Sequence, residues 1–278
     1  MTEVAQRKDI RDLRIIRSVE LVPTRTTALS DIVDAGVMLA DLSDMFTAPE
    51  NPRGLPGIDP VIALYEATRN NDIIPMPHIT PRDKNALFIR SQAITALKFG
   101  INHFFVIGGD PINPEANSRE VREIDVMETI SEISRSGKLV KSQDGVMSNI
   151  VVGSAINPYR PNEEEIASKK MENGSSLFIS QIIFDPQLLE KDWIKKRNFK
   201  ILAGFMAIRK KSQVDFAEKL HINMPAEIRE KFRNSDDITT TSRNVILEAF
   251  DGLKGYVDGI HLMPMGHNDL AKDILECI

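Results

Sequence analysis

Short apolar runs alternate with segments of helical spacing along the whole 278-residue sequence. Each run has the length of a buried strand, and the residues after it place apolar side chains three or four positions apart. Eight such strand–helix units, with no linker or low-complexity segment between them, predict an α/β protein built as a single (β/α)8 TIM barrel over residues 1–278. The strands are expected near residues 15–22, 36–42, 73–79, 102–108, 149–155, 176–183, 199–205 and 257–263.

Proline and glycine mark the ends of the helices between these strands. Proline follows Asp59 and Asp185 and so would occupy the first helical position. Gly100 and Gly174 fall where helices should stop. The expected helices span residues 27–35, 59–70, 84–99, 119–135, 162–173, 187–195, 212–221 and 239–250, with an additional short helix at 226–233.

A doubly wound open sheet is the alternative architecture for this alternation. No Gly-x-Gly-x-x-Gly sequence follows the first strand, which argues against a dinucleotide-binding version of that fold. Residues 1–13 precede the first strand, and we expect them to form a flexible or capping N-terminal segment.

Charge and composition narrow the class of protein. The net charge of −5 gives no basic field that would attract nucleic acid or an anionic membrane. The N-terminus lacks the apolar core of a signal peptide, and no apolar run approaches the length of about 18 residues that spans a bilayer. The lone Cys277 excludes a disulfide framework, and no His, Asp or Glu residues have metal-ligand spacing. A soluble cytoplasmic protein without a metal is therefore expected.

The segment His103–Pro111 carries the clearest sign of a functional site. Four apolar residues beginning at Phe104 predict a buried parallel strand, and two glycines after it allow a ligand to come close to the backbone. Asp110 then follows at the C-terminal end of the strand, where (β/α)8 barrels place binding and catalytic groups. The alternative is that Asp110 only caps the next turn.

Polar residues recur at other strand ends. Glu20 lies in an apolar setting that would raise its pKa and suit a general acid, unless it forms an ion pair with Arg17 or Arg25. His78 could bond a phosphate or a ring carbonyl, or could be a satisfied structural histidine. Gln181 offers the donor and acceptor needed to read a pterin or flavin edge, or could pair with the backbone.

These segments together resemble the methylenetetrahydrofolate reductase family, whose members are flavoprotein (β/α)8 barrels. The resemblance extends over about residues 14–275 and is specific in the combination of its motifs. The similar stretches are Val19–Pro23 (Phe-Glu-x-x-Pro in the family), Pro77–Thr80 (Pro-His-Leu-Thr), Arg82–Asn85 (Arg-Asp-Arg-Asn), Gly108–Pro111 (Arg-Gly-Asp-x-Pro), Lys170–Asp185 (ending Ile-Thr-Gln-x-x-Phe-Asp), Phe216–Pro225 and Gly259–His261.

The resemblance implies an oxidoreductase of one-carbon metabolism and methionine biosynthesis. Such an enzyme reduces a 5,10-methylene-tetrahydropterin to the 5-methyl form by hydride transfer from reduced FMN, or FAD, with NADH, NADPH or a protein as electron donor. A homo-oligomer is expected because it is common in the family. The implied site residues are Glu20 as the general acid that protonates N10, Asp110 at the pterin and the flavin, Gln181 and Phe216 at the substrate, and His78, Gly109 and Lys170 at the cofactor.

The sequence also departs from the family pattern in three places. Gly108 replaces an arginine, Asp44–Arg53 replaces a Thr-Tyr-Gly motif after the second strand, and Leu262–Met265 replaces a polar strand end that helps to hold folate. A methanopterin-type carrier is therefore an alternative substrate. A barrel without reductase activity, which binds a pterin as a subunit of a methyl-transfer complex, is the alternative function.

Overall fold

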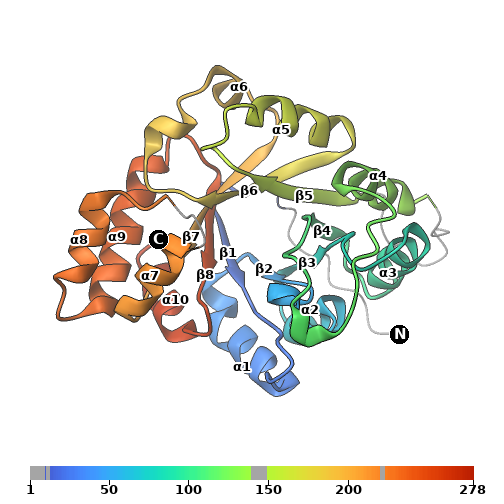
Figure 1. Ribbon diagram of the computed structural model, residues 1–278, viewed down its shortest axis with the longest axis horizontal. Coiled ribbons are helices and arrows are strands. Elements are labelled where there is room, and N and C mark those ends of the chain that lie inside the picture. The colour runs from blue at the N-terminus through green and yellow to red at the C-terminus, as the bar shows by residue number, and fades with distance from the viewer. Residues whose placement is uncertain (1–9, 11–12, 139–148, 220–222) are drawn as a thin grey trace.

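The computed structural model describes residues 10, 13–138, 149–219 and 223–278, except for the side chains of residues 216, 218 and 219. Its parallel strands close into a barrel in which each strand pairs with its neighbours in sequence and β8 pairs with β1 (Figure 1). This order confirms the (β/α)8 barrel and excludes the doubly wound sheet. The strands are β1 Ile16–Glu20, β2 Met45–Ala48, β3 Ile74–Ile79, β4 His103–Val106, β5 Val151–Ile156, β6 Ser175–Ile182, β7 Lys200–Met206 and β8 Gly259–Met263.

Helices surround the barrel on its outer side (Figure 1). The α-helices are α1 Leu29–Leu39, α2 Pro60–Thr68, α3 Ala86–Lys98, α4 Val126–Ser136, α5 Glu163–Glu172, α6 Asp192–Lys195, α7 Lys211–Lys219, α8 Ala226–Arg233, α9 Ile238–Leu253 and α10 Asn268–Leu275. The described 3-10 helices are η2 Ala40–Leu42, η3 Pro52–Gly54, η4 Pro114–Ala116 and η6 Pro186–Leu189.

Alternation along the strands separates two kinds of apolar core. Val19 of β1 is fully buried in the layer between the strands and the helices. Ile16, three residues earlier and on the opposite face of β1, packs inside the barrel with Met45 of β2 and Ile74 of β3. Glu20 lies on the same face of β1 as Ile16, at the C-terminal end of the strand, where (β/α)8 barrels place binding and catalytic groups.

The second strand lies elsewhere than the sequence predicts. Residues 36–42, expected as a strand, continue α1 and then form η2, while β2 is the four-residue segment Met45–Ala48. Gly36 and Leu39 are buried in α1 while Val37 is 70% exposed, which is the burial pattern of a helix. A short apolar run fits both structures, so its periodicity could not distinguish them.

Other element boundaries also differ from the prediction. Helix α4 begins at Val126 rather than at residue 119, because Asp125 and Glu128 form a capping box there. The helix expected at 187–195 divides into η6 and α6, and α10 was not predicted. Of the N-terminal segment, residues 1–9 and 11–12 lie outside the described chain, whereas Ile10 is 1% exposed and packs with the inner core; its capping role stays a prediction.

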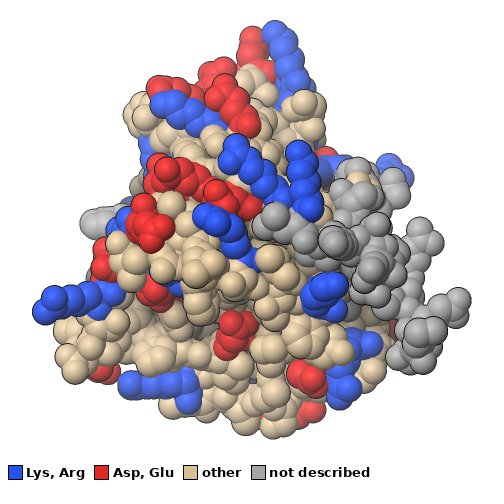
Figure 2. All heavy atoms as spheres, turned by 90° about the vertical axis from the view of Figure 1, so that its right-hand side faces the viewer, with Lys and Arg blue, Asp and Glu red and all other residues tan. Residues whose placement is uncertain are grey.

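Acidic and basic side chains are interspersed on the surface that faces right in Figure 1, as Figure 2 shows. Helices α3 and α4 lie on this side, and an ion pair between Arg90 and Glu132, 2.8 Å apart, joins them. Within the described part of the chain, no helix is both long enough and apolar enough to cross a bilayer.

The seam between β8 and β1 leads to a test of barrel closure. A Cβ atom at Gly259 would lie 2.0 Å from the carbonyl oxygen of Ile16, so Gly259→Ala must push the two strands apart. We expect it to lower the free energy of unfolding by about 1–3 kcal/mol, measured by urea unfolding. Gly255→Ala is the matched control because no atom lies within 4 Å of its Cβ position. If Gly259→Ala lowered the free energy of unfolding no more than Gly255→Ala does, the close approach of β8 to β1 at Gly259 would be contradicted.

Candidate active site

Glu20, the last residue of β1, is a carboxyl group without a partner at the C-terminal end of the barrel. Among the described residues it makes no hydrogen bond and no ion pair. Arg17 and Arg25, its predicted alternative partners, instead pair with Asp44 at 3.3 Å and with Glu115 at 3.5 Å. Burial, and then the negative charge of Asp110, raise the pKa of Glu20 to about 7. A carboxyl group with this pKa can donate a proton at neutral pH.

His78, near the end of β3, is a buried histidine whose ring nitrogens are both unsatisfied. Its residue is 4% exposed, and within the described structure neither Nδ1 nor Nε2 has a hydrogen-bond partner. The ring lies 4.8 Å from that of Phe105, centroid to centroid. Burial, and then the nearby His261, lower the pKa of His78 to about 3, so the ring is neutral. The alternative of a satisfied structural histidine is therefore wrong, and one donor and one acceptor are left for a ligand.

Two further polar groups inside the barrel were not predicted as site residues, although His261 belongs to a stretch that resembles the family. His261 of β8 bonds the Ser18 hydroxyl of β1 through Nδ1 at 2.8 Å, and burial lowers its pKa to about 3. Thr47 of β2 lies opposite Glu20 in the ladder, is fully buried, and has no partner for its hydroxyl in the described residues. Thr47 could have been found only if β2 had been placed correctly.

Asp110 joins two loops at the mouth of the barrel. Its Oδ2 accepts a hydrogen bond from the backbone N–H of Arg53 at 3.0 Å, and its carbonyl oxygen accepts one from Nη1 of Arg82 at 2.8 Å. Asp110 therefore does not merely cap the turn that follows it. The preceding Gly109 has φ +74°, and a Cβ there would lie 3.2 Å from Thr80 Cγ2, so the position favours glycine.

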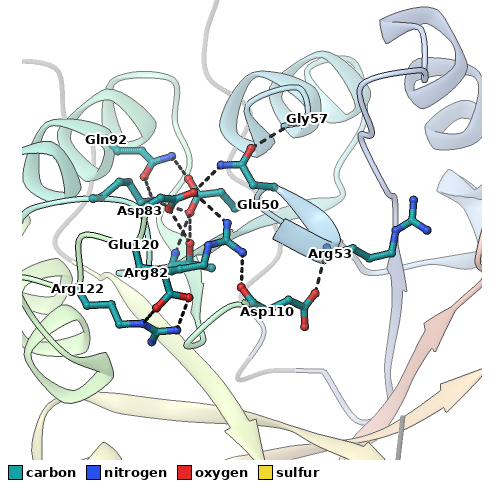
Figure 3. Close-up of polar contacts among 12 residues, drawn as sticks. Glu50, Arg53, Gly57, Arg82, Asp83, Gln92, Asp110, Glu120 and Arg122 are labelled. Atoms are coloured by element: carbon teal, nitrogen blue, oxygen red, sulfur yellow. Dashed lines mark hydrogen bonds and ion pairs between the residues drawn. The ribbon is translucent and has the colours of Figure 1, made fainter. Parts of the chain in front are cut away.

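A buried polar network supports these loops from the side of β2 and β3 (Figure 3). Arg82, only 1% exposed, also donates to Asp83 at 2.9 Å. The Glu50 carboxylate accepts bonds from the backbone of Thr80 at 2.8 Å and from Nζ of Lys84 at 2.5 Å. Because buried charges are stable only when they are paired and hydrogen-bonded, this network fixes the loops in one arrangement.

A cavity of about 430 Å³ lies beside this network rather than at the mouth of the barrel. Its walls include Glu50, Lys84 and the half-exposed Phe88, whereas Glu20 and His78 do not line it. The chemistry described above is therefore not located in this cavity.

The remaining predicted residues have different surroundings. Gln181 is exposed on β6, and its Oε1 accepts a hydrogen bond from the backbone N–H of Ile182 at 3.0 Å. Its oxygen thus makes the backbone contact that was the alternative to ligand binding. Lys170 of α5 is 8% exposed and donates to the carbonyl of Ala155 at 2.5 Å, while burial lowers its pKa. Phe216 belongs to α7, but its side chain is outside the described part of the structure.

The raised pKa of Glu20 predicts how stability depends on pH. The folded protein binds the Glu20 proton more tightly than the unfolded chain does, because the pKa is about 7 in the folded state and 4.5 in the unfolded state. The contribution of Glu20 to the free energy of unfolding is therefore fully present below pH 4.5 and is lost as the pH rises through about 7. We expect the loss to be about 1–3 kcal/mol. Glu20→Gln, which is neutral throughout, should raise Tm at pH 8 but not at pH 4. Glu227→Gln, an exposed change on α8, is the control, and a pH-independent effect of Glu20→Gln would contradict the assignment.

Comparison with known proteins gives the same family as the motifs. The family model for methylenetetrahydrofolate reductase matches residues 60–278. No curated protein matches the chain. A protein described as uncharacterized, from Clostridium thermocellum, which binds two copies of 5-methyl-5,6,7,8-tetrahydrofolic acid, is 12% identical with a TM-score of 0.61, over 95% of this chain and 97% of that one.

Two other solved structures share the fold at similar distance. The aldolase QR15 is 13% identical with a TM-score of 0.53, over 95% of this chain and 96% of its own. A 2,3-dimethylmalate lyase is 11% identical with a TM-score of 0.52, over 96% of this chain and 82% of its own. At such identities these structures establish the barrel alone. The family model covers most of the chain, and the protein therefore belongs to the methylenetetrahydrofolate reductase family.

Proposed function

We propose that this protein reduces a 5,10-methylene-tetrahydropterin, either methylenetetrahydrofolate or a related one-carbon carrier, to its 5-methyl form. Bound FMN or FAD would supply the hydride and would be reduced by NADH, NADPH or an electron-donor protein. The observation that carries this proposal is the carboxyl group of Glu20 at the mouth of the barrel, which has no partner among the described residues and whose pKa is raised to about 7. Family membership and the methyltetrahydrofolate bound by the related barrel support it.

Glu20 is proposed as the general acid. The methylene bridge of the carrier opens when N10 is protonated, and the electrophile that results can then accept hydride. A carboxyl group with a pKa of about 7 is matched to this task, because half of it still holds its proton at neutral pH. Burial is the main cause of that raised pKa, and the charge of Asp110 adds to it. Asp110 is also proposed to contact the pterin.

Buried polar atoms that lack hydrogen-bond partners inside the described barrel support the proposal of a bound flavin. His78 and Thr47 present buried polar atoms without partners among the described residues, and a ring with carbonyl and N–H groups would satisfy them. Gly109, just after β4, is also proposed to contact the flavin. Lys170 is proposed at the phosphate, since its bond to Ala155 leaves other N–H donors of the ammonium group for an anion.

Gln181 and Phe216 complete the proposed substrate site. The exposed amide of Gln181 retains its N–H donors for a pterin ring, because only its oxygen is used by the backbone of Ile182. Phe216 is proposed to stack on the carrier or on nicotinamide. A cytoplasmic homo-oligomer is part of the same proposal.

The alternative function is a pterin-binding barrel that serves as a subunit of a methyl-transfer complex. The related barrel from Clostridium thermocellum favours it, because the compound bound there is already the methylated carrier. Gly108, in place of the family's arginine, also removes a cationic contact for a flavin. The alternative requires tight binding of the methylated carrier without binding of a flavin.

Replacing the acid tests the reaction. We expect Glu20→Gln to slow reduction of the methylene carrier by roughly 10²-fold or more, the scale that follows loss of a general acid. Reduction of the flavin by its electron donor should be unchanged, because that half-reaction needs no proton at N10. Stopped-flow absorbance of the flavin measures the two half-reactions separately. Glu227→Gln is again the control, and wild-type turnover of Glu20→Gln would show that the carboxyl group is not the acid.

Flavin binding tests the cofactor and separates the two functions. We expect the purified protein to show flavin absorbance or to bind FMN or FAD in titration, and His78→Ala and Lys170→Ala to weaken that binding. Lys169→Ala is the matched control, because Lys169 lies on the same helix but is exposed and pairs with Glu165 at 2.7 Å. A protein that binds 5-methyltetrahydrofolate but neither flavin in excess would support the methyl-transfer alternative.

A further inference from the structure

The loop between β2 and α2 holds its backbone in an unusual conformation. Asn51 has φ +43° and Arg53 has φ +58°, and both are left-handed although neither is glycine. Gly54 follows with φ +68°. Left-handed backbone is unfavourable for an arginine, so the rest of the structure must hold it there.

Contacts within the loop and from two other segments, the loops after β3 and β4, hold it in place. The side chain of Asn51 donates to Asp83 at 2.8 Å and accepts from the backbone of Gly57 at 3.2 Å. The backbone N–H of Arg53 donates to the Asp110 carboxylate at 3.0 Å. Gly54 fits against the loop after β4 so closely that a Cβ there would lie 2.1 Å from a carbonyl oxygen. The backbone of Arg53 is therefore fixed beside the carboxylate that raises the pKa of Glu20.

The guanidinium group of Arg53, in contrast, is left unused. The residue is exposed, and its side chain has no hydrogen-bond or ion-pair partner in the described chain. Arg25, on the neighbouring loop, pairs with Glu115, and Arg82 is fully buried with two partners. Figure 3 shows the side chain of Arg53 extending away from Asp110. The backbone N–H of Arg53 thus bonds the Asp110 carboxylate, while the guanidinium group of Arg53 points away from it.

We propose that Arg53 binds the anionic arm of the pterin carrier and so selects carriers that have one. This inference rests on the proposed function, which places the pterin head near Glu20 and Asp110. The carboxylates of a folate lie at the opposite end of the molecule from the pterin. A protein group that binds them must therefore extend outward from the pterin site beside Glu20 and Asp110. A guanidinium group bonds a carboxylate in a bidentate manner and is always charged. A rigid backbone reduces the entropy lost when the pair forms.

Carriers with and without the arm test this role. Calorimetric titration would give Kd for 5-methyltetrahydrofolate, for its triglutamate form, and for 6-methyltetrahydropterin, which has no arm. We expect Arg53→Gln to weaken binding of the two arm-bearing carriers by about 10- to 150-fold, the range for loss of a hydrogen bond to a charged group. Binding of 6-methyltetrahydropterin should not change.

Three variants control for changes in the loop itself. Arg25→Gln removes a neighbouring exposed charge and should leave every Kd unchanged. Arg53→Lys should retain part of the affinity, because it keeps the charge but loses the bidentate geometry. Arg53→Asn should lose affinity as Arg53→Gln does while keeping its Tm, because asparagine tolerates left-handed backbone.

The outcomes separate the two proposals. Equal Kd values of wild-type protein and Arg53→Gln for the arm-bearing carriers would overturn the role of Arg53. If Arg53→Gln weakens binding of 6-methyltetrahydropterin as much as binding of the arm-bearing carriers, Arg53 has a structural role. If it weakens binding of FMN but not of riboflavin or of the carriers, Arg53 binds the phosphate of the cofactor. Either result overturns the proposal. If the wild-type protein binds none of the carriers, the proposed function fails and this inference fails with it.

Discussion

The Asp110 carboxyl group is the point at which the loops over the barrel and the electrostatics of the site meet. The side chain of Asp110 accepts a hydrogen bond from the backbone of Arg53, and the backbone carbonyl oxygen of Asp110 accepts one from the buried Arg82. The pKa of Glu20 is raised first by burial and then by the charge of Asp110. Each effect depends on the position of one short segment after β4. The left-handed Gly109 allows that segment to approach the loop after β3 closely. A displacement here would change the acid and the loop together.

The stability of this arrangement depends on charges that are buried in pairs. Glu50 and Lys84, each with 7% of its side chain exposed, lie between the loop after β2 and the start of α3. Removing one member of such a pair leaves an uncompensated charge and typically costs about 3–5 kcal/mol. Glu20 differs because it has no cation beside it within the described residues. The same barrel therefore pairs the Glu50 carboxylate with a buried cation and leaves the carboxyl group of Glu20 without one in the described structure.

Much of the fold followed from alternation in the sequence, whereas the geometry of the site did not. The apolar strands and the polar strand ends at Glu20, His78 and Asp110 were predictable because burial imposes a regular pattern. The strand Met45–Ala48 was misplaced because a four-residue strand after a helix has too little pattern of its own. Arg53 could not be identified at all, since its conformation depends on contacts with segments far away in sequence.

A general acid at Glu20 requires that the folded protein raise the pKa of this carboxyl group to about 7. The most direct test is a ¹³C NMR titration of protein labelled at the glutamate δ-carboxyl carbons, with Glu20→Gln used to assign the resonance. We predict a pKa of about 7 for this group. A pKa near the ordinary value of 4.5 would mean that Glu20 is ionised under working conditions, and it would contradict its role as the acid.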